Sequence, residues 1–404
     1  MSGAAITGFG LHGAFGDLAA SWRALQEGRS GVQAYSLPDS PGLPQVAAAP
    51  AAPIDLSAFL TDPKLQKYMG PATELAVLAA GRALSDAGAL GDPKLREATA
   101  LFVTTDLIAF ALRDVMPAVL TALREGHGID HGWLGADGFR GCHPLMPFKL
   151  LLNMPLGMVS IVFGLRGDNF INYPNAQQSA VCLEAAVRGL ASGRFSRALV
   201  GASAHPLCLS PMLRALRGEE VAWVPARADP AGPSHQGLAP ADAAAFVQVE
   251  SAEEARRRGA EVLALLSAVT SSGPDAFVGV DELEGGLEAI LHEAAAGMAV
   301  EWVVATGFRS RAELHACARA VRRRGSAGAP ALVSFDGRLG YGGAAALVSA
   351  MALGSRLLSG AAPAGTLIAG APPRRRARRV LVLSRDGEGA LAAALLAASP
   401  EAPR

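Results

Sequence analysis

The chain has 404 residues, a length that suggests two packed domains or one large layered domain. Half of the residues are apolar and 18% are charged, a balance that excludes long intrinsic disorder. The 36 basic residues match the 36 acidic residues, and this zero net charge argues against a dedicated nucleic-acid binder.

Three further features bear on the compartment. The longest apolar stretch, residues 150–165, contains Asn153, Pro155 and Gly157, which favours buried core over a membrane span. The N-terminus has no basic region before an apolar stretch, so no signal peptide is expected. The four cysteines are far apart and make no metal-spaced pair. We therefore expect a reduced cytoplasmic protein without a disulfide framework, metal or cofactor, and without membrane or nucleic-acid partners.

The first half of the chain alternates short apolar runs with amphipathic runs, the pattern of an α/β protein. Pro71 opens one predicted helix, which runs to Ala87, and Gly88 closes it. The other predicted helices are Leu18–Gln26 and Ser179–Ser192, and the predicted strands are Ala4–Gly8, Leu101–Val103 and Ala198–Gly201.

The second half repeats this scheme. Strands are expected at Phe246–Val249, Val262–Val269, Trp302–Ala305, Ala331–Ser334, Thr366–Ala369 and Val380–Ser384, and helices at Leu283–Ala295, Arg311–Arg323 and Ala344–Leu358. The Pro- and Gly-rich stretch Arg227–Pro240 divides the chain into halves at residues 1–226 and 241–404. Two similar halves with central helices suggest a five-layer α-β-α-β-α sandwich.

Several motifs resemble the β-ketoacyl synthase family, which has the thiolase fold. They are Ile6-Thr7-Gly8-Phe9-Gly10 followed by Trp22 and Glu27-Gly28-Arg29-Ser30-Gly31, then Ala83-Leu84-Ser85-Asp86-Ala87-Gly88, Asn153-Met154, Ser160-Ile161, Phe163-Gly164-Leu165-Arg166-Gly167 and residues 250–260. Each motif alone is weak, but together they follow the family order over nearly the whole chain.

The resemblance implies a condensing site, which needs a cysteine at a helix N-terminus and two histidines. By count from Gly193, the cysteine position falls on Ala176, beside Gln177 and Gln178. Thr306 and Arg338 occupy the two histidine positions. Three groups missing at three separate motifs make condensation by this chain improbable.

The element Gly337-Arg338-Leu339 resembles the chain-length factor, the β subunit of type II polyketide synthases. That resemblance implies a non-catalytic subunit that pairs with an active ketosynthase through the strand at residues 169–173 and bounds the tunnel for the growing chain. The candidate tunnel or interface residues are Asp106, Phe110, Asp114, Phe170 and Tyr173.

A dense basic run offers a second partner surface. Arg374, Arg375, Arg376, Arg378 and Arg379 could attract an acidic acyl carrier protein, although a solvated loop is the simpler interpretation.

Other functions stay open at this stage. The chain could be a malonyl-carrier decarboxylase, a hydrolase that uses Ser179, another divergent acyl-thioester enzyme, or a scaffold without a tunnel. Cys182 is expected to be a small buried residue two turns inside its helix, and the adjacent pair Cys142-His143 has poor geometry for one metal. The product class, the chain length and the starter unit are not indicated by the sequence.

Overall fold

A computed structural model gives the fold of the protein. It describes residues 3–38, 42, 45–106, 111–124, 128–217, 237–273, 280–295, 297–324 and 330–399. Within these ranges, eleven strands form one mixed sheet in the order β13-β12-β11-β14-β15-β10-β1-β9-β8-β4-β7. Antiparallel pairing of β1 (Ala4–His12) with β10 (Ala264–Ser271) joins a first half of the sheet to a second half.

The strands of the two halves are otherwise grouped by sequence. The first half contains β4 (Ala100–Thr105), β7 (Asn169–Asn172), β8 (Arg197–Ala204) and β9 (Ala243–Glu250), and the second contains β11 (Trp302–Thr306), β12 (Ala331–Val333), β13 (Leu367–Ala369), β14 (Arg379–Arg385) and β15 (Leu391–Ala397). Strand β9, which follows the predicted start of the second half at residue 241, lies between β1 and β8 in the sheet.

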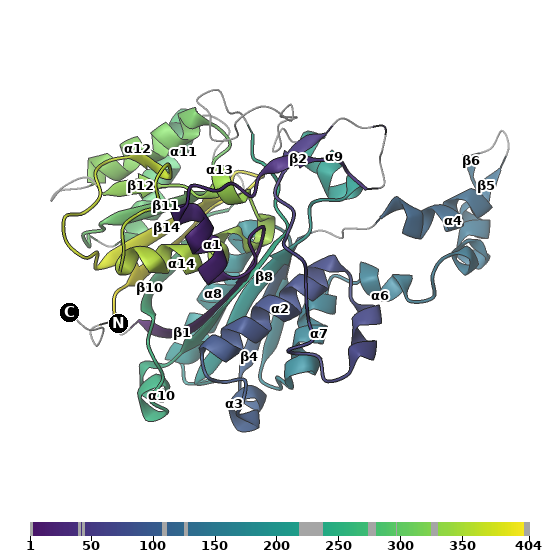
Figure 1. Ribbon diagram of the computed structural model, residues 1–404, viewed down its shortest axis with the longest axis horizontal. Coiled ribbons are helices and arrows are strands. Elements are labelled where there is room, and N and C mark those ends of the chain that lie inside the picture. Colours follow the sequence, from purple (N-terminus) through teal and green to yellow (C-terminus); the bar gives the residue numbers. More distant parts are fainter. Residues whose placement is uncertain are drawn as a thin grey trace.

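Helices cover both faces of each half and give five layers (Figure 1). Helices α8 (Asn175–Ala191) and α14 (Ala346–Ser355) lie in the middle and contact strands of both halves. Helices α2 (Pro71–Asp86) and α7 (Met154–Phe163) cover the outer face of the first half. The outer layer of the second half is α11 (Val280–Ala295) with α12 (Arg311–Arg324). The five-layer sandwich expected from the sequence is therefore present.

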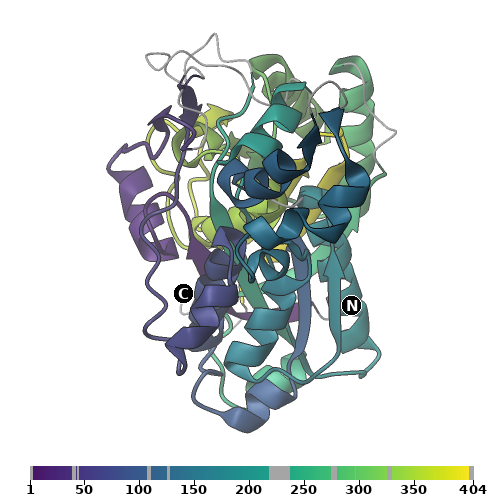
Figure 2. The ribbon, with the colours of Figure 1, turned by 90° about the vertical axis from the view of Figure 1, so that its right-hand side faces the viewer.

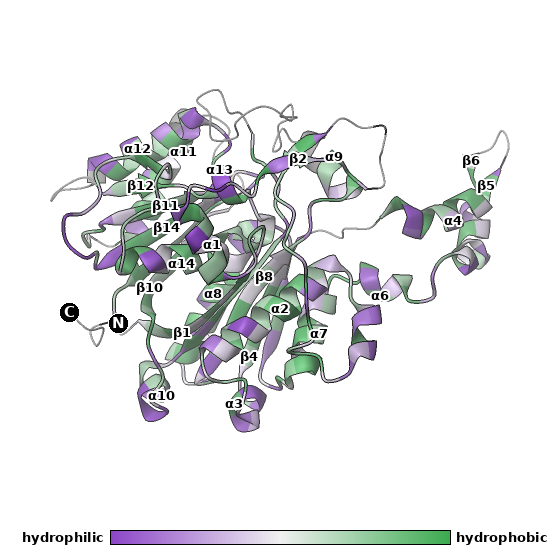
Figure 3. Ribbon diagram, in the orientation of Figure 1, coloured by the Kyte–Doolittle hydropathy of each residue, from purple (hydrophilic) through white to green (hydrophobic). Residues whose placement is uncertain are grey.

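The remaining described elements, apart from those between residues 111 and 150, are short. They are α1 (Leu18–Gln26), β2 (Gln33–Tyr35), β3 (Val46–Ala48), η1 (Pro63–Tyr68), α3 (Pro93–Glu97), α9 (Leu209–Arg217), α10 (Ala252–Arg257), α13 (Asp336–Leu339), η4 (Gly343–Ala345) and η5 (Arg356–Leu358). Figure 3 shows apolar residues along the central strands and helices and polar residues on peripheral α3 and α10. Glycines allow the closest packing here: a Cβ on Gly10 would overlap the carbonyl oxygen of Ala79 in α2.

An arm formed by residues 111–124 and 128–150 extends from the body of the molecule (Figures 1 and 2). Its described elements are α4 (Leu112–Ala122), β5 (Leu123–Arg124), β6 (Gly128–Ile129), α5 (His131–Ala136), η2 (Gly138–Gly141) and α6 (Met146–Leu150). A small core of Ala118, Cys142 and Met146 holds the arm together. Outside that core, the large side chains Leu120, Leu123, Trp133, Phe139 and Phe148 are exposed.

Two simple expectations about the chain can be compared with the structure. Among the described residues, no helix is both long and apolar enough to cross a membrane. All four cysteines are buried and none forms a disulfide.

Candidate functional site at the head of helix α8

Helix α8 begins earlier than the sequence pattern indicates, at Asn175 rather than at Ser179. A cis peptide bond joins Tyr173 to Pro174, and Asn175 adopts a left-handed backbone with φ of 77°. Ala176 follows and is completely buried. The position at which the resemblance implies a nucleophile therefore lies in the first turn of α8, where the helix dipole is positive, but it carries only a methyl group.

The carboxylate of Asp106 lies against the head of α8. The backbone N–H of Asn175 donates to Asp106 Oδ1 over 3.3 Å, and the N–H of Ala344 in η4 lies 3.1 Å from Oδ1 and 3.2 Å from Oδ2. Sequence reasoning assigned Asp106 to a tunnel or interface, and gave no sign of this contact. The contact means that an acid of the chain itself already occupies amide donors that could otherwise bind an anion.

The polar residues that follow Ala176 bond to one another or to backbone. The amide of Gln178 donates to Gln177 Oε1 over 2.7 Å. Ser179 is buried, and its hydroxyl donates to the carbonyl of Ala344 over 2.7 Å. A serine nucleophile needs a base that takes its proton, whereas this hydroxyl proton is directed at a carbonyl oxygen. The geometry therefore gives no support to the hydrolase alternative.

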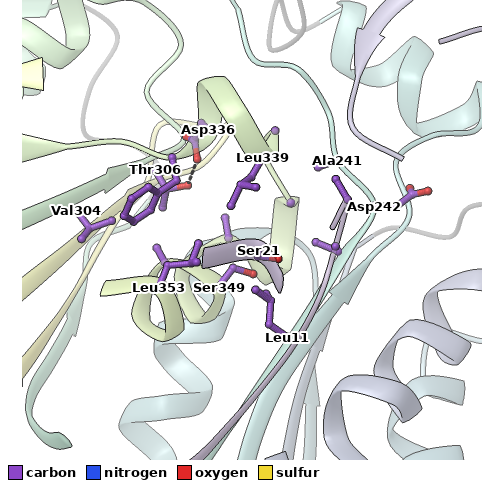
Figure 4. A pocket seen from close by; sticks show the side chains of 18 of the residues that line it. Leu11, Ser21, Ala241, Asp242, Val304, Thr306, Asp336, Leu339, Ser349 and Leu353 are labelled. Carbon is purple, nitrogen blue, oxygen red and sulfur yellow. Dashed lines mark hydrogen bonds between the residues drawn. The ribbon is translucent and has the colours of Figure 1, made fainter. Parts of the chain in front are cut away.

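The first expected histidine position, at the end of β11, is part of a hydrogen-bonded cluster around one acid, Asp336. The hydroxyl of Thr306 donates to Asp336 Oδ1 over 2.9 Å, and the N–H of Gly307 donates to Asp336 Oδ2 over 2.7 Å (Figure 4). Burial raises the pKa of Asp336 to about 6, although both hydrogen bonds act in the opposite direction. Sequence reasoning missed Asp336, whose only signal was its position directly before the Gly337-Arg338 element.

The second expected histidine position holds Arg338, whose guanidinium is hydrogen-bonded to a loop. Its Nη1 donates to the carbonyl of Gly28 over 2.9 Å, and its own carbonyl accepts the N–H of Gly31 over 2.7 Å. Both contacts tie α13 to the loop after α1. The three positions thus hold a methyl group, a hydroxyl bound to a carboxylate, and a guanidinium bound to a carbonyl.

A cavity of about 50 Å³ lies beside this cluster. Figure 4 shows Thr306 and Asp336 at one side of it and the apolar side chains of Leu11, Leu339 and Leu353 around it. Its volume corresponds to only a few water molecules, which is too small for an extended acyl chain.

The remaining chemical candidates are structural in character. Cys182 lies inside α8 in contact with Thr104, and burial raises the pKa of its thiol to about 11, so it stays protonated at neutral pH. Cys142 is buried in the arm core, whereas His143 is exposed. Among the described residues, no group of three or more His, Cys, Asp or Glu side chains is arranged to hold a metal.

The candidate interface residues fall in three places. Phe170 and Tyr173 lie on and just after β7, the last strand of the sheet order, and are 44% and 52% exposed. Asp114 is half-buried in the first turn of α4 on the arm. Phe110 lies outside the described residues.

The basic run lies at the end of strand β14 that is opposite to the end beside Thr306. Arg379 begins β14, and β14 runs parallel to β11 with Ser384 beside Thr306. Arg379 is therefore about 17 Å along the strand from the level of Thr306, at about 3.3 Å per residue. Arg374, Arg375 and Arg378 are exposed.

A His–Asp pair was missed by sequence reasoning altogether. Nδ1 of His205, just after β8, lies 2.9 Å from Oδ1 of Asp242, just before β9. No motif connects these residues, which the antiparallel pairing of β8 with β9 brings together.

Comparisons with known proteins agree with the fold. The ishigamide ketosynthase/chain length factor aligns over 98% of this chain and 99% of that chain, with a TM-score of 0.77 and 20% identity. A β-ketoacyl synthase from Burkholderia phymatum STM815 aligns over 99% and 100%, with a TM-score of 0.76 and 18% identity. A type II polyketide synthase ketosynthase, solved with its acyl-carrier protein and bound to the hexaketide, aligns over 98% and 100%, with a TM-score of 0.75 and 16% identity.

Sequence comparison gives a match to a family model. No curated protein sequence matches the chain significantly. The family model described as the β-ketoacyl synthase N-terminal domain matches residues 2–255, which is more than half of the chain. Together with the thiolase-like sandwich, this match means that the chain belongs to the β-ketoacyl synthase family.

Proposed function

We propose that this chain is a non-catalytic chain-length factor that pairs with an active ketosynthase in type II polyketide or polyene biosynthesis. The observation that carries the proposal is the head of α8, where Ala176 stands at the nucleophile position and the Asp106 carboxylate accepts the amides of Asn175 and Ala344. Neither Thr306 nor Arg338 can act as an imidazole base, and their side chains have other partners.

The edge of the sheet supports a partner on this side of the molecule. Strand β7 pairs only with β4 among the described strands, which leaves its other edge unpaired. Exposed strand edges flanked by large apolar side chains are normally covered. Phe170 and Tyr173 at this edge, Ile161 on α7 and the exposed side chains of the arm would be buried by a ketosynthase that extends the sheet.

Control of product length follows from such an interface. A tunnel that crosses it ends where side chains of this chain fill the space, because a close-packed wall cannot admit another two-carbon unit. Asp114, Phe170 and Tyr173 are the described candidates for that wall, and Phe110 is the candidate outside the described residues.

An acyl carrier protein is the second proposed partner, and the five arginines at and just before the start of β14 are its candidate contact. Their distance from the level of Thr306 suggests docking rather than delivery of the acyl group to α8. We expect charge reversal of Arg374 and Arg375 to raise the KM for the carrier without changing product length. Added salt should also raise this KM, because it screens the attraction between the two surfaces.

The proposed function is tested by reconstitution. The chain, a ketosynthase encoded beside it with an intact Cys-His-His set, and the complex of the two are each supplied with malonyl-carrier and an acyl starter. We expect copurification of the two chains and full-length products from the complex only. Elongation by this chain alone, or release of carbon dioxide from malonyl-carrier by this chain alone, would contradict the proposal.

A further inference from the structure

A second pocket, of about 40 Å³, lies on the outer side of the first half of the sheet. Thr105 at the end of β4 and Ser203 near the end of β8 are neighbours across these parallel strands, and both line it. Residues 70–73 at the start of α2, residues 149–152 at and just after the end of α6, and Pro155 in the first turn of α7 also line it. The carboxyl ends of parallel strands facing a helix start are a common place for ligands in α/β proteins.

Ser203 is the first sign that the pocket is built for a ligand. Its side chain is 0% exposed, and its hydroxyl has no hydrogen-bond partner among the described residues. A buried hydroxyl without a partner costs stability, so such groups normally bond to protein, water or a ligand. Ser203 is one of the residues that line the pocket, so its hydroxyl is the unpartnered donor nearest to a ligand there.

The start of α2 adds a positive dipole end. The helix is 16 residues long, and no side chain among the described residues caps it. Its N-cap is Gly70, and a Cβ there would lie 3.8 Å from Cβ of Lys149, so the lysine is held close to the helix start. An uncapped helix N-terminus beside a lysine favours a negatively charged ligand.

The other charges in the pocket are already compensated. His205 lines the pocket, and its Nδ1 lies 2.9 Å from Oδ1 of Asp242, which orients the ring. Asp106 also lines the pocket, but its carboxylate is bonded to the N–H groups of Asn175 and Ala344. At the start of α2, Pro71 has no N–H, and the N–H groups of Thr73 and Glu74 donate to the Gly70 carbonyl. The groups proposed to donate to a ligand are therefore Ser203, Lys149 and the N–H of Ala72.

We propose that this pocket binds a small oxyanion, either a carboxylate or a phosphate group. The site is separate from the methyl group of Ala176 and does not depend on whether the chain pairs with a ketosynthase. Its size suits a small ion or the end group of a larger molecule rather than an acyl chain.

The test is a titration of the full chain with inorganic phosphate and, separately, with malonate, at an ionic strength held constant with chloride. Calorimetry is expected to show saturable binding of at least one, and the ligand is expected to raise the melting temperature. Tighter phosphate binding would identify a phosphate source, and tighter malonate binding a carboxylate source. Both results support the oxyanion site.

Variants connect binding to the residues named. Lys149→Gln and Ser203→Ala are each expected to weaken binding by about tenfold, the usual size of one lost charge-assisted hydrogen bond. Because the Ser203 hydroxyl lacks a protein partner, Ser203→Ala should not lower stability without ligand, so lost binding cannot be ascribed to unfolding. Lys94→Gln, on exposed α3, is the matched control and should bind as the unaltered chain does.

Three results would overturn the proposal. These are no saturable binding of either anion, unchanged affinity in both Lys149→Gln and Ser203→Ala, or equal binding of the neutral analogue malonamide. Each would mean that these residues do not form an oxyanion site, and none would bear on condensation or on the heterodimer.

Discussion

At the scale of single residues, Asp106 is the acid that lies against the head of α8. Its carboxylate joins the head of α8 to η4 through two backbone N–H groups. We expect Asp106→Ala to lower the free energy of unfolding by about 1–3 kcal/mol, because both buried amides lose their acceptor. Urea denaturation of the two proteins measures the difference.

Asp114→Ala is the matched control for that change. Asp114 is also an acid on the segment that follows β4, but it is half-buried in the first turn of α4. Its removal should alter stability by no more than about 0.5 kcal/mol. Equal losses in the two variants would show that the contact of Asp106 with α8 and η4 is not what stabilises this region.

Asp336 predicts a pH dependence of stability. Burial raises its pKa from 3.8 to about 6 in the folded chain, so the folded state binds this proton more tightly than the unfolded state. Stability should therefore fall as the pH rises from about 4 to about 6, and the loss should be complete above that range. In Asp336→Asn the contribution is absent, and the difference between the two stability–pH curves isolates it. Parallel curves from pH 4 to 7 would contradict the raised pKa.

The residues of the site could be predicted from the sequence only in part. Ala176, Thr306 and Arg338 could be named as candidate positions because each lies at a fixed count within a local motif. Their actual partners could not be found, because hydrogen bonds such as Arg338 to Gly28 join residues 310 positions apart, and the sequence carries no local signal for them. The pair of His205 and Asp242 was missed for the same reason.

At the scale of elements, β7 is the strand whose exposed edge and apolar side chains call for a partner. We expect Phe170→Glu to weaken the complex with the ketosynthase by at least about tenfold, because a charge would be buried in the interface. Sedimentation of the mixed proteins gives the dissociation constant, and circular dichroism of the variant alone checks its fold.

Leu367→Glu provides the comparison on the opposite edge of the same sheet. Leu367 begins β13 and is 41% exposed, close to the 44% of Phe170. It should leave the dissociation constant unchanged. Equal weakening by both substitutions would argue against β7 as the specific docking edge.

Elements with strong local signals were predicted well, and those shaped by distant contacts were not. Pro71 and Gly88 bracket α2 closely, as the sequence indicated. Strand β15 was not predicted, although it is buried between β10 and β14. The helices of the arm were also not predicted. Helix α4 contains Pro117, and its exposed apolar residues do not mark an inward face.

At the scale of the whole molecule, the two halves share one sheet and one middle layer, so the fold does not depend on which side chains stand at the head of α8. Helices α8 and α14 pack against strands of both halves through small and aliphatic side chains. A nucleophile or base at the head of α8 contributes little to that core, and can be replaced while the scaffold and its outer surfaces remain.

The central claim, that this family scaffold no longer carries an acyl group, is tested most directly by intact-mass spectrometry of the purified chain after incubation with an acyl thioester and with malonyl-carrier. The account predicts no covalent acyl adduct, because Ala176 offers no nucleophile and both Ser179 and Cys182 are buried and protonated. A stoichiometric acyl adduct that maps to the peptide containing α8 would contradict it.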